Sequence, residues 1–194
     1  METNIHLIRH GLTEGNKKNM FYGHSDIPLT DEGVSLIKAL VDEGIYPRPK
    51  DAAFYSSGLI RAEQTLSLIY GEIPHIRLDS LKEIYFGDYE LKTHNELKKD
   101  PEYISWIKNR SGLSAPPGGE SLALFKKRVK AGMRNVLEAD ARHSVIVSHG
   151  GVICVIMAHC FDDIQGNIFK WIPAPGHGYS ITFNAGHPAG YTAF

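Results

Sequence analysis

Three short apolar segments, each followed by a helical pattern, constrain the fold of this chain most strongly. Residues 4–8 (NIHLI), 52–56 (AAFYS) and 144–148 (SVIVS) are β-branched or aromatic and are bounded by polar or turn-forming residues, as buried strands are. Strands that alternate with helices form a mostly parallel sheet with helices on both faces. The chain is therefore expected to adopt an α/β fold.

The spacing of apolar residues predicts three amphipathic helices. The first begins after Thr30, which is placed to cap a helix opened by Asp31 and Glu32. The apolar stripes are Val34, Ile37 and Val41 in the first helix, Leu59, Ala62, Leu66 and Ile69 in the second, and Leu122, Phe125, Val129, Met133 and Val136 in the longest. These stripes are the expected helical side of the core.

Residues 84–119 interrupt this alternation. The stretch is rich in Tyr, Lys and Glu, and it contains a short helix with Asp100 as cap and Pro101 in its first turn. It ends in the loop APPGGE. We expect it to be an excursion over one end of the sheet, within a single domain of residues 1–194. After a strand at 179–183, the C-terminal stretch FNAGHPAGYTAF is expected to be loosely ordered.

The composition excludes several classes of partner. The 194 residues are 42% hydrophobic, enough for a sizeable core, and 21 Lys and Arg balance 22 Asp and Glu. No overall field therefore attracts nucleic acid or an anionic membrane. The N-terminus shows no secretory signal, and no segment reaches the roughly 18 apolar residues of a membrane span. We expect a cytoplasmic protein without nucleic-acid or membrane partners; the sequence indicates no oligomeric state.

The two cysteines carry no metal or disulfide signal. Cys154 and Cys160 lie six residues apart, which matches neither a zinc pair nor a disulfide framework in a chain of this size. We expect both to be free, buried thiols.

Reactive side chains follow the three predicted strands. The first strand ends in Arg9-His10-Gly11, the second in Ser56-Ser57-Gly58 with Arg61 just beyond, and 144–148 is followed by His149-Gly150-Gly151. Because the carboxyl ends of parallel strands share one edge, the two arginines and two histidines are expected to meet there. Guanidinium groups keep their charge and match the oxygens of a phosphoryl group. The predicted ligand is therefore a phosphoryl dianion.

The two histidines favour catalysis over simple binding, because neutral imidazole adds little charge to an anion site. A ring nitrogen of His10 can attack phosphorus and form a phosphohistidine, while the cations stabilise the equatorial oxygens. The adjacent arginine favours the neutral form of the His10 imidazole, whereas a bound dianion favours the protonated form. The sequence therefore does not decide the charge of His10. Glu83, shielded by Tyr85 and Phe86, is the predicted general acid with a raised pKa. This scheme needs no metal or other cofactor.

Six short motifs occur together in a family-specific order. They are LIRHGLTEGN, YGHSDIPLTDEG, SSGLIRAEQT, LKEIYFGDYE, PPGGES and VIVSHGGVI. In this order and spacing the chain resembles the histidine phosphatase superfamily, also called phosphoglycerate-mutase-like. The resemblance implies a three-layer α/β/α sandwich with a mostly parallel central sheet and a helical lid over the carboxyl edge of the strands.

The resemblance also implies roles for individual residues. It makes His10 the phosphorylated nucleophile and Glu83 the proton donor. Its phosphate ligands are Arg9, Asn16, Arg61 and His149. Asn16 takes this role by its place in the pattern Arg-His-Gly-x-Thr-x-x-Asn. Further substrate-binding positions are Tyr22, Gly23 and Gly150.

Three positions depart from the family's pattern. Leu12 stands where Glu or Gln is usual, Gly58 replaces a common Asp, and Leu91 occupies a position where Gly is usual. None of them is a basic residue of the site or Glu83. We therefore expect the chemistry to be intact and the departures to bear on loop structure and substrate preference.

Three functions fit these observations. The first is a phosphatase for small-molecule phosphomonoesters, because EIYFGDYE resembles the small phosphatases of the family, among them α-ribazole phosphatases. This makes α-ribazole 5′-phosphate one possible substrate. The second is a cofactor-dependent phosphoglycerate mutase, although the stretch between Glu83 and PPGGES is short for that branch. The third is a phosphate-binding regulatory module without turnover, against which the retained histidines, arginines and Glu83 argue.

Overall fold

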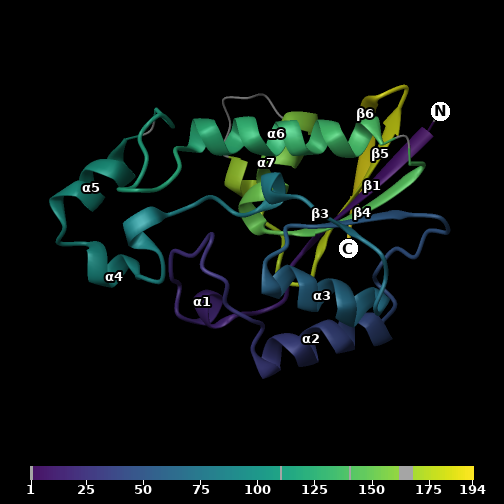
Figure 1. Cartoon of the computed structure of the whole chain (residues 1–194), viewed down its shortest axis with the longest axis horizontal. Helices are drawn as coiled ribbons and strands as arrows, with labels where there is room; N and C mark the ends of the chain where they lie inside the picture. Colours follow the sequence, from purple (N-terminus) through teal and green to yellow (C-terminus); the bar gives the residue numbers. More distant parts are fainter. Residues whose placement is uncertain (1, 110, 140, 162–167) are drawn as a thin grey trace.

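The computed structural model describes residues 2–109, 111–139, 141–161 and 168–194. Within these residues a six-stranded sheet has the order β3-β2-β4-β1-β5-β6 (Figure 1). The strands are β1 (Glu2–Arg9), β2 (Ala53–Ser56), β3 (Ile76–Arg77), β4 (His143–Ser148), β5 (Gly178–Asn184) and β6 (His187–Ala193). The first four pair in parallel, whereas β5 is antiparallel to β1 and β6 to β5. The prediction of a mostly parallel α/β sheet is confirmed.

Local signals fix where the helices begin. The helices are α1 (Glu14–Lys17), α2 (Asp31–Asp42), α3 (Ile60–Tyr70), α4 (His94–Leu97), α5 (Pro101–Lys108), α6 (Leu122–Glu138) and α7 (Gly150–Phe161), with 3-10 turns η1 (Asp79–Leu81), η2 (Gly87–Tyr89) and η3 (Ile168–Trp171). Thr30 accepts a hydrogen bond from the backbone N–H of Gly33 and so caps α2. Asp100 caps α5 ahead of Pro101. Both caps were predicted.

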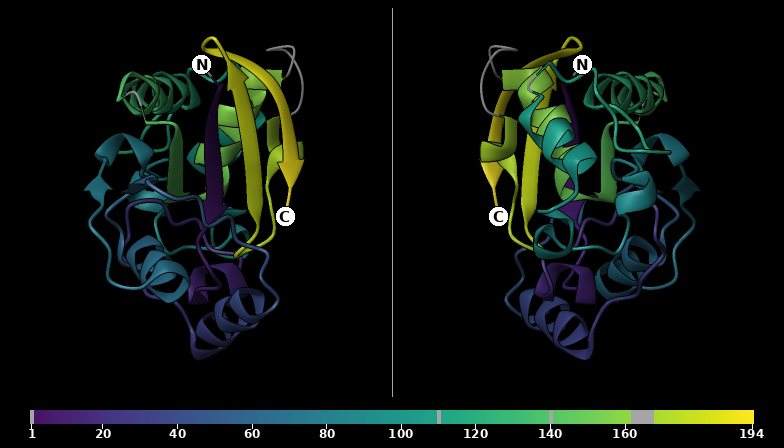
Figure 2. Two further views of the ribbon diagram at one scale, coloured as in Figure 1. Left: turned by 90° about the vertical axis from the view of Figure 1, so that its right-hand side faces the viewer. Right: turned by 90° about the vertical axis from the view of Figure 1, so that its left-hand side faces the viewer.

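Helices cover both faces of the sheet, which gives three layers. Figures 1 and 2 show α2 and α3 on one face and α6 and α7 on the other. Side chains of β1 alternate between them, because Ile5 and Leu7 pack with α6 and α7 and Ile8 packs with α2 and α3. The α/β/α arrangement is as expected. Among the described helices, none has the length and apolarity to cross a bilayer.

The C-terminal stretch FNAGHPAGYTAF contradicts the prediction of loose order. It completes β5 and forms β6, which pair as a hairpin. The turn between them has Ala185 and Gly186 at φ 50° and 80°, the left-handed conformation of tight hairpin turns. Phe194 and Gly178 exchange backbone hydrogen bonds of 3.0 and 3.1 Å. The prediction is wrong because the turn at Ala185 and Gly186 lets the last residues pair with β5.

The segment 84–119 leaves the sheet beyond the carboxyl end of β1, where α4 and α5 lie at the far left of Figure 1. It has a small core of its own, formed by Tyr89, Leu97, Tyr103, Phe86 and Trp106. Phe21, from the loop after α1, also packs into this core and so joins the two segments. The excursion is where the sequence predicts it, and its action as a lid stays a prediction.

Candidate active site

The carboxyl ends of β1 and β4 bring the basic residues together. Arg9 lies opposite Ser148 in this parallel pair, so the residues that follow, His10 and His149, are neighbours with ring centroids 5.2 Å apart. Arg61 enters from the first turn of α3 with a fully buried side chain. Its Nε donates to Nδ1 of His149 over 3.3 Å. Two arginines and two histidines therefore meet at one edge of the sheet.

A cavity of about 320 Å³ opens at this edge. Among the predicted site residues, those that line it are Arg9, His10, Asn16, Tyr22, Arg61, Glu83 and Gly150. His149 and Gly23 do not line it, and both contact Arg61 instead. The remainder of the wall is mostly apolar or aromatic, including Phe21, Ile84 and Phe86.

His10 is held as one neutral tautomer. Its Nδ1 lies 2.7 Å from the carbonyl oxygen of Gly11, and because a carbonyl only accepts, Nδ1 carries the proton and Nε2 keeps its lone pair. The pKa of His10 lies well below its usual value, because burial disfavours the imidazolium and the charges of Arg61 and Arg9 act in the same direction. The free protein thus presents a neutral imidazole, the form that a nucleophile requires.

Arg61 is fixed by protein acceptors around it. Nη1 donates to the carbonyl oxygen of Ser25 over 2.9 Å and Nη2 to that of Gly23 over 2.7 Å. The guanidinium lies 4.9 Å from the ring centroid of Tyr22, within cation–π range. With the bond from Nε to His149, these contacts use three of the five N–H groups of the side chain. Two remain for an anion in the cavity.

His149 is buried, and both of its ring nitrogens have protein partners. Nδ1 accepts from Arg61, so Nε2 carries the proton and donates to Oγ of Ser57 over 2.8 Å. Burial, followed by the charge of Arg61, holds the pKa of His149 well below its usual value. His149 therefore contacts Arg61 and does not line the cavity itself. The direct phosphate contact that the resemblance implies requires exchange of the bond to Ser57.

Arg9 and Asn16 are each held by groups outside the cavity. Arg9 donates from Nη1 to the carbonyl oxygen of Pro173 over 2.8 Å, and Gly150 lies against its guanidinium. Oδ1 of Asn16 accepts from the backbone N–H and from Oγ1 of Thr13, both at 3.1 Å, in a capping box at the start of α1. This leaves Nδ2 of Asn16 as the group available to a ligand.

The carboxyl group of Glu83 lies in the cavity, beside the first turn of α7. Its Oε1 accepts from the backbone N–H of Ile84 over 2.9 Å and its Oε2 from that of Gly151 over 2.8 Å. Burial nevertheless raises the pKa of Glu83, although these hydrogen bonds and both arginines act in the opposite direction. A carboxyl group with a raised pKa is better suited than an ordinary glutamic acid to protonate a leaving alkoxide.

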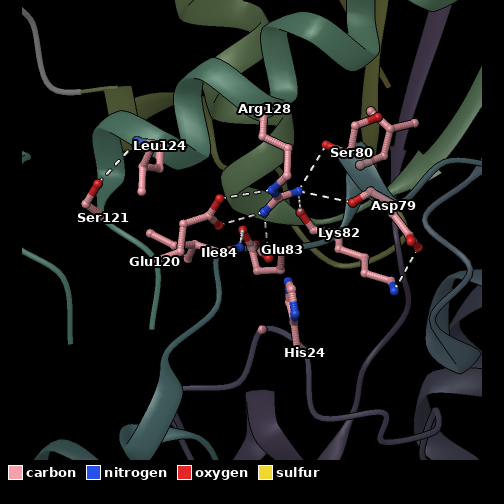
Figure 3. A network of polar contacts seen from close by, with 12 residues as sticks. His24, Asp79, Ser80, Lys82, Glu83, Ile84, Glu120, Ser121, Leu124 and Arg128 are labelled. Atoms are coloured by element: carbon pink, nitrogen blue, oxygen red, sulfur yellow. Dashed lines mark hydrogen bonds and ion pairs between the residues drawn. The ribbon is translucent and has the colours of Figure 1, made fainter. Parts of the chain in front are cut away.

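Arg128 of α6 holds the segment that carries Glu83, a contact that the sequence did not predict. Figure 3 shows its guanidinium surrounded by backbone carbonyl groups. The carbonyl acceptors are those of Asp79 at 3.2 Å, Ser80 at 3.0 Å, Lys82 at 3.0 Å and Glu83 at 3.3 Å. Glu120 completes the set as a bidentate ion pair of 3.0 and 2.7 Å. An arginine of an amphipathic helix resembles an ordinary surface residue, so only the structure reveals this role.

Glu90 ties the loop of Gly23 to the excursion, and this too was missed. One carboxylate oxygen accepts from the backbone N–H groups of Gly23, His24 and Phe86, and the other accepts from that of Ser25. Although burial acts in the opposite direction, the hydrogen bonds hold the pKa of Glu90 below its usual value. Gly23 and Ser25 in turn supply the carbonyl groups that bind Arg61. Glu90 therefore supports the position of Arg61.

The remaining reactive groups lie outside this arrangement. Both cysteines are free, and burial raises the pKa of Cys154 to about 12 and that of Cys160 to about 11. The prediction of free thiols is confirmed, with Cys154 buried and Cys160 partly buried. In the part of the chain that the structure describes, no three His, Cys, Asp or Glu side chains are grouped to hold a metal ion.

Comparison with known proteins decides the family. The family model described as histidine phosphatase superfamily, branch 1, matches residues 5–190 of this chain. The chain belongs to the histidine phosphatase superfamily. Among its relatives, the adenosylcobalamin/alpha-ribazole phosphatase of Salmonella typhimurium is 33% identical over 157 residues, 78% of this chain and 76% of that protein. The 2,3-bisphosphoglycerate-dependent phosphoglycerate mutase of Cytophaga hutchinsonii is 36% identical over 167 residues, 79% of this chain and 75% of that protein.

Solved structures agree with this assignment. The alpha-ribazole phosphatase of Shigella flexneri superposes with a TM-score of 0.85 at 25% identity, covering 96% of this histidine phosphatase and 94% of that chain. A phosphoglycerate mutase of Thermus thermophilus superposes with a TM-score of 0.73 at 30% identity, covering 99% of each chain. The predicted family and fold are confirmed, and the relatives indicate a phosphatase enzyme.

Proposed function

We propose that this histidine phosphatase hydrolyses a small-molecule phosphomonoester through a phosphohistidine on His10. The observation that carries the proposal is the neutral imidazole of His10, with its lone pair on Nε2, in a cavity that also holds Arg9, Arg61 and the carboxyl group of Glu83. One cavity thus contains the proposed nucleophile, two arginines that can bind the phosphoryl group, and the proposed acid.

In the first step, Nε2 of His10 attacks phosphorus and the bond from phosphorus to the ester oxygen breaks. Glu83 gives its proton to that oxygen, and the product alcohol leaves. The N–H groups of Arg9, Arg61 and Asn16 stabilise the three equatorial oxygens as charge develops on them. His149 acts through its hydrogen bond to Arg61.

In the second step, water attacks the phosphohistidine. The Glu83 carboxylate, deprotonated by the first step, takes the proton of the attacking water, and the bond between Nε2 and phosphorus breaks. Inorganic phosphate leaves, and His10 and Glu83 return to their starting forms. No step of this scheme requires a metal ion or an organic cofactor.

The cavity lining favours a phosphatase over a phosphoglycerate mutase. Within the described lining, the permanent cations are Arg9 and Arg61, and both belong to the phosphate site. A phosphoglycerate carries a carboxylate beyond its phosphate. Among the described residues of the lining there is no third permanent cation to pair with that carboxylate, and an unpaired charge is unfavourable in a largely apolar cavity.

The names of the relatives suggest the substrate. Since several relatives are alpha-ribazole phosphatases, we propose α-ribazole 5′-phosphate as the first candidate, with the 84–119 segment as a lid over it. A cytoplasmic location stays a prediction.

Product analysis separates the three functions. With a chelator present, the protein is expected to release inorganic phosphate from p-nitrophenyl phosphate and from α-ribazole 5′-phosphate, and His10→Ala is expected to release none. Isomerisation of phosphoglycerates faster than their hydrolysis, dependent on 2,3-bisphosphoglycerate, would establish the mutase instead. Phosphate binding without turnover in the wild type, unchanged in His10→Ala, would establish the binding module.

A further inference from the structure

Thr65 is the last residue of the motif SSGLIRAEQT and lies one helical turn after Arg61 in α3. Its side chain is fully buried, and it does not line the proposed catalytic cavity. A buried threonine inside a helix is unfavourable in itself, because β-branching lowers helix propensity and a hydroxyl group away from water needs partners. The partners of this hydroxyl group therefore decide what the residue contributes.

The hydroxyl group of Thr65 joins the helix of Arg61 to the residue that follows His10. Its Oγ1 donates its single proton to the carbonyl oxygen of Arg61 over 2.7 Å. The lone pairs of Oγ1 are then left to accept, and the backbone N–H of Gly11 donates to them over 3.0 Å. One buried oxygen atom thus connects α3 to the chain just beyond β1.

The backbone of Gly11 is held on two sides. A Cβ at this position would lie 2.9 Å from Cγ1 of Ile37 and 3.3 Å from the carbonyl oxygen of Gly33, so the backbone packs closely against α2. On the other side, the hydrogen bond to Thr65 ties it to α3. Since α2 and α3 lie side by side (Figure 1), Gly11 has a fixed place between them.

The carbonyl group of Gly11 carries this constraint to the nucleophile. It accepts the proton on Nδ1 of His10 over 2.7 Å and so keeps the lone pair on Nε2. Both backbone polar groups of Gly11 are thus used, the N–H by Thr65 and the carbonyl by His10. Without an acceptor at Nδ1, a neutral imidazole can carry its proton on either nitrogen, and the form with the proton on Nε2 has no lone pair there to attack phosphorus.

We propose that Thr65 is a positioning residue for the nucleophile: by fixing the backbone of Gly11, it selects the tautomer and the orientation in which His10 attacks. Thr65 acts in this way on the attacking group, whereas the arginines of the cavity act on the phosphoryl group. The inference rests on the proposed phosphatase function and deepens it by assigning the residue that prepares His10.

Thr65→Val tests the proposal, because it removes the hydroxyl group and keeps the size of the side chain. A methyl group in place of Oγ1 leaves the N–H of Gly11 without a partner and forces it away. We expect the rate of phosphorylation of His10 by p-nitrophenyl phosphate, measured as the first-turnover release of p-nitrophenol, to fall about 10- to 100-fold. The dissociation constant of inorganic phosphate should stay close to the wild-type value, since the side-chain contacts of Arg61 are unchanged.

Two further substitutions locate the effect. Thr65→Ser restores the hydroxyl group and should recover most of the lost rate. Thr182→Val is the matched control, because the hydroxyl group of Thr182 in β5 donates to Oδ1 of Asn4 over 2.9 Å and the residue does not line the cavity. It removes a comparable hydrogen bond elsewhere and should keep the wild-type rate. The melting temperature of each variant checks that it is folded.

Nitrogen-15 NMR of His10 tests the inference without turnover, with His10→Ala to assign the signals. The wild type should show a protonated Nδ1 and an unprotonated Nε2. In Thr65→Val, signals of the form protonated at Nε2 should appear. A wild-type His10 with its proton on Nε2 would overturn the inference even if Thr65→Val did not fold.

The outcomes separate this inference from the proposed function. If Thr65→Val keeps a rate within about threefold of the wild type, or if Thr65→Ser is as slow as Thr65→Val, the positioning role is wrong and the phosphatase stands. Equal losses of phosphate affinity and of rate would assign the effect to the arginines that bind phosphate, which would also overturn it. If the wild type forms no phosphohistidine, the proposed function fails, and the NMR spectra still decide whether Thr65 sets the tautomer of His10.

Discussion

At the scale of single residues, burial shifts the pKa values of the two groups proposed to carry the reaction in opposite directions. It lowers the pKa of His10 and raises the pKa of Glu83, because in each case the uncharged form is favoured away from water. A nucleophile with a free lone pair therefore lies in the same cavity as a carboxyl group that holds its proton to a higher pH than an ordinary glutamic acid does. Shifts of this kind, which favour a neutral imidazole and a protonated carboxyl group in the same site, are typical of catalytic groups.

Glu83→Gln tests the acid. We expect the rate of enzyme phosphorylation by an alkyl phosphate to fall about 10² to 10⁴-fold, while p-nitrophenyl phosphate, whose leaving group needs no proton, loses much less. In the wild type the alkyl rate should fall as pH rises through the raised pKa of Glu83 and should persist below pH 6.5, where His10 stays neutral. Rapid-quench single turnovers measure both rates. Equal losses on both substrates would remove Glu83 from the acid role.

Arg128→Met tests the positioning of Glu83. Removal of the guanidinium frees the carbonyl groups of residues 79, 80, 82 and 83 and leaves Glu120 unpaired. We therefore expect about a tenfold loss of kcat on alkyl phosphates with a smaller loss on p-nitrophenyl phosphate. Arg134→Met on the same helix is the matched control, because its side chain is exposed. The pH profile of kcat should change in the first variant alone. If both variants behave alike, Arg128 has no positioning role.

At the scale of elements, the parts of the site that could be predicted are those that follow from chain order. The carboxyl ends of parallel strands lie at one edge of the sheet. The proximity of Arg9, His10 and His149 could therefore be predicted from the apolar segments and the residues that directly follow them. Helix caps such as Thr30 depend on neighbouring residues alone and were also predictable. Arg128 and Glu90 were not, because they bind backbone groups of distant segments; Gly23 lies 67 residues before Glu90. Contacts with backbone groups of segments far away in the chain leave no residue pattern in a sequence.

Gly151→Ala tests the contact between α7 and Glu83. A Cβ at this position would lie closer to the carboxylate of Glu83 than van der Waals contact allows, so the carboxylate must move away from the backbone N–H that now binds it. We expect kcat on alkyl phosphates to fall at least about tenfold with little loss of stability, since alanine favours a helix. Gly190→Ala is the control, because a Cβ there meets nothing within 4 Å. Equal kcat values for the two variants would contradict the contact.

At the scale of the whole molecule, the net charge is close to zero, but folding changes the pKa values of several buried histidines. His6, in the central strand β1, has its pKa lowered to about 4, first by burial and then by His143. Burial also lowers the pKa of His10 and His149. The sequence identified the last two as reactive but gave no sign that His6 would be affected, because burial of one face of a central strand depends on the packed layers.

Stability is therefore expected to fall in mild acid. Below pH 6.5 the unfolded chain binds protons at His6 that the folded chain does not bind until about pH 4, so the free energy of unfolding falls as pH falls. The slope is at most about 1.4 kcal/mol per pH unit for each such histidine. His10 and His149 act in the same direction, whereas the raised pKa of Glu83 acts in the opposite one.

Urea titrations between pH 7.5 and pH 5 measure this slope, and His6→Gln isolates one group. Below about pH 6 the slope of the variant should be smaller than that of the wild type, by at most about 1.4 kcal/mol per pH unit, and near pH 7.5 the two slopes should agree. It should keep the phosphatase activity, because His6 pairs with Ser180 and does not line the cavity. Equal slopes for the wild type and His6→Gln below pH 6 would show that His6 titrates normally.

The most direct measurement of the central claim is the site of phosphorylation. The protein is mixed with a phosphomonoester, quenched in base within its first turnover, and its peptides are analysed by mass spectrometry. We expect one phosphoryl group on His10, stable in base and lost in acid, and none in His10→Ala. A phosphoryl group on another residue, or turnover without any phosphorylated His10, would contradict the mechanism.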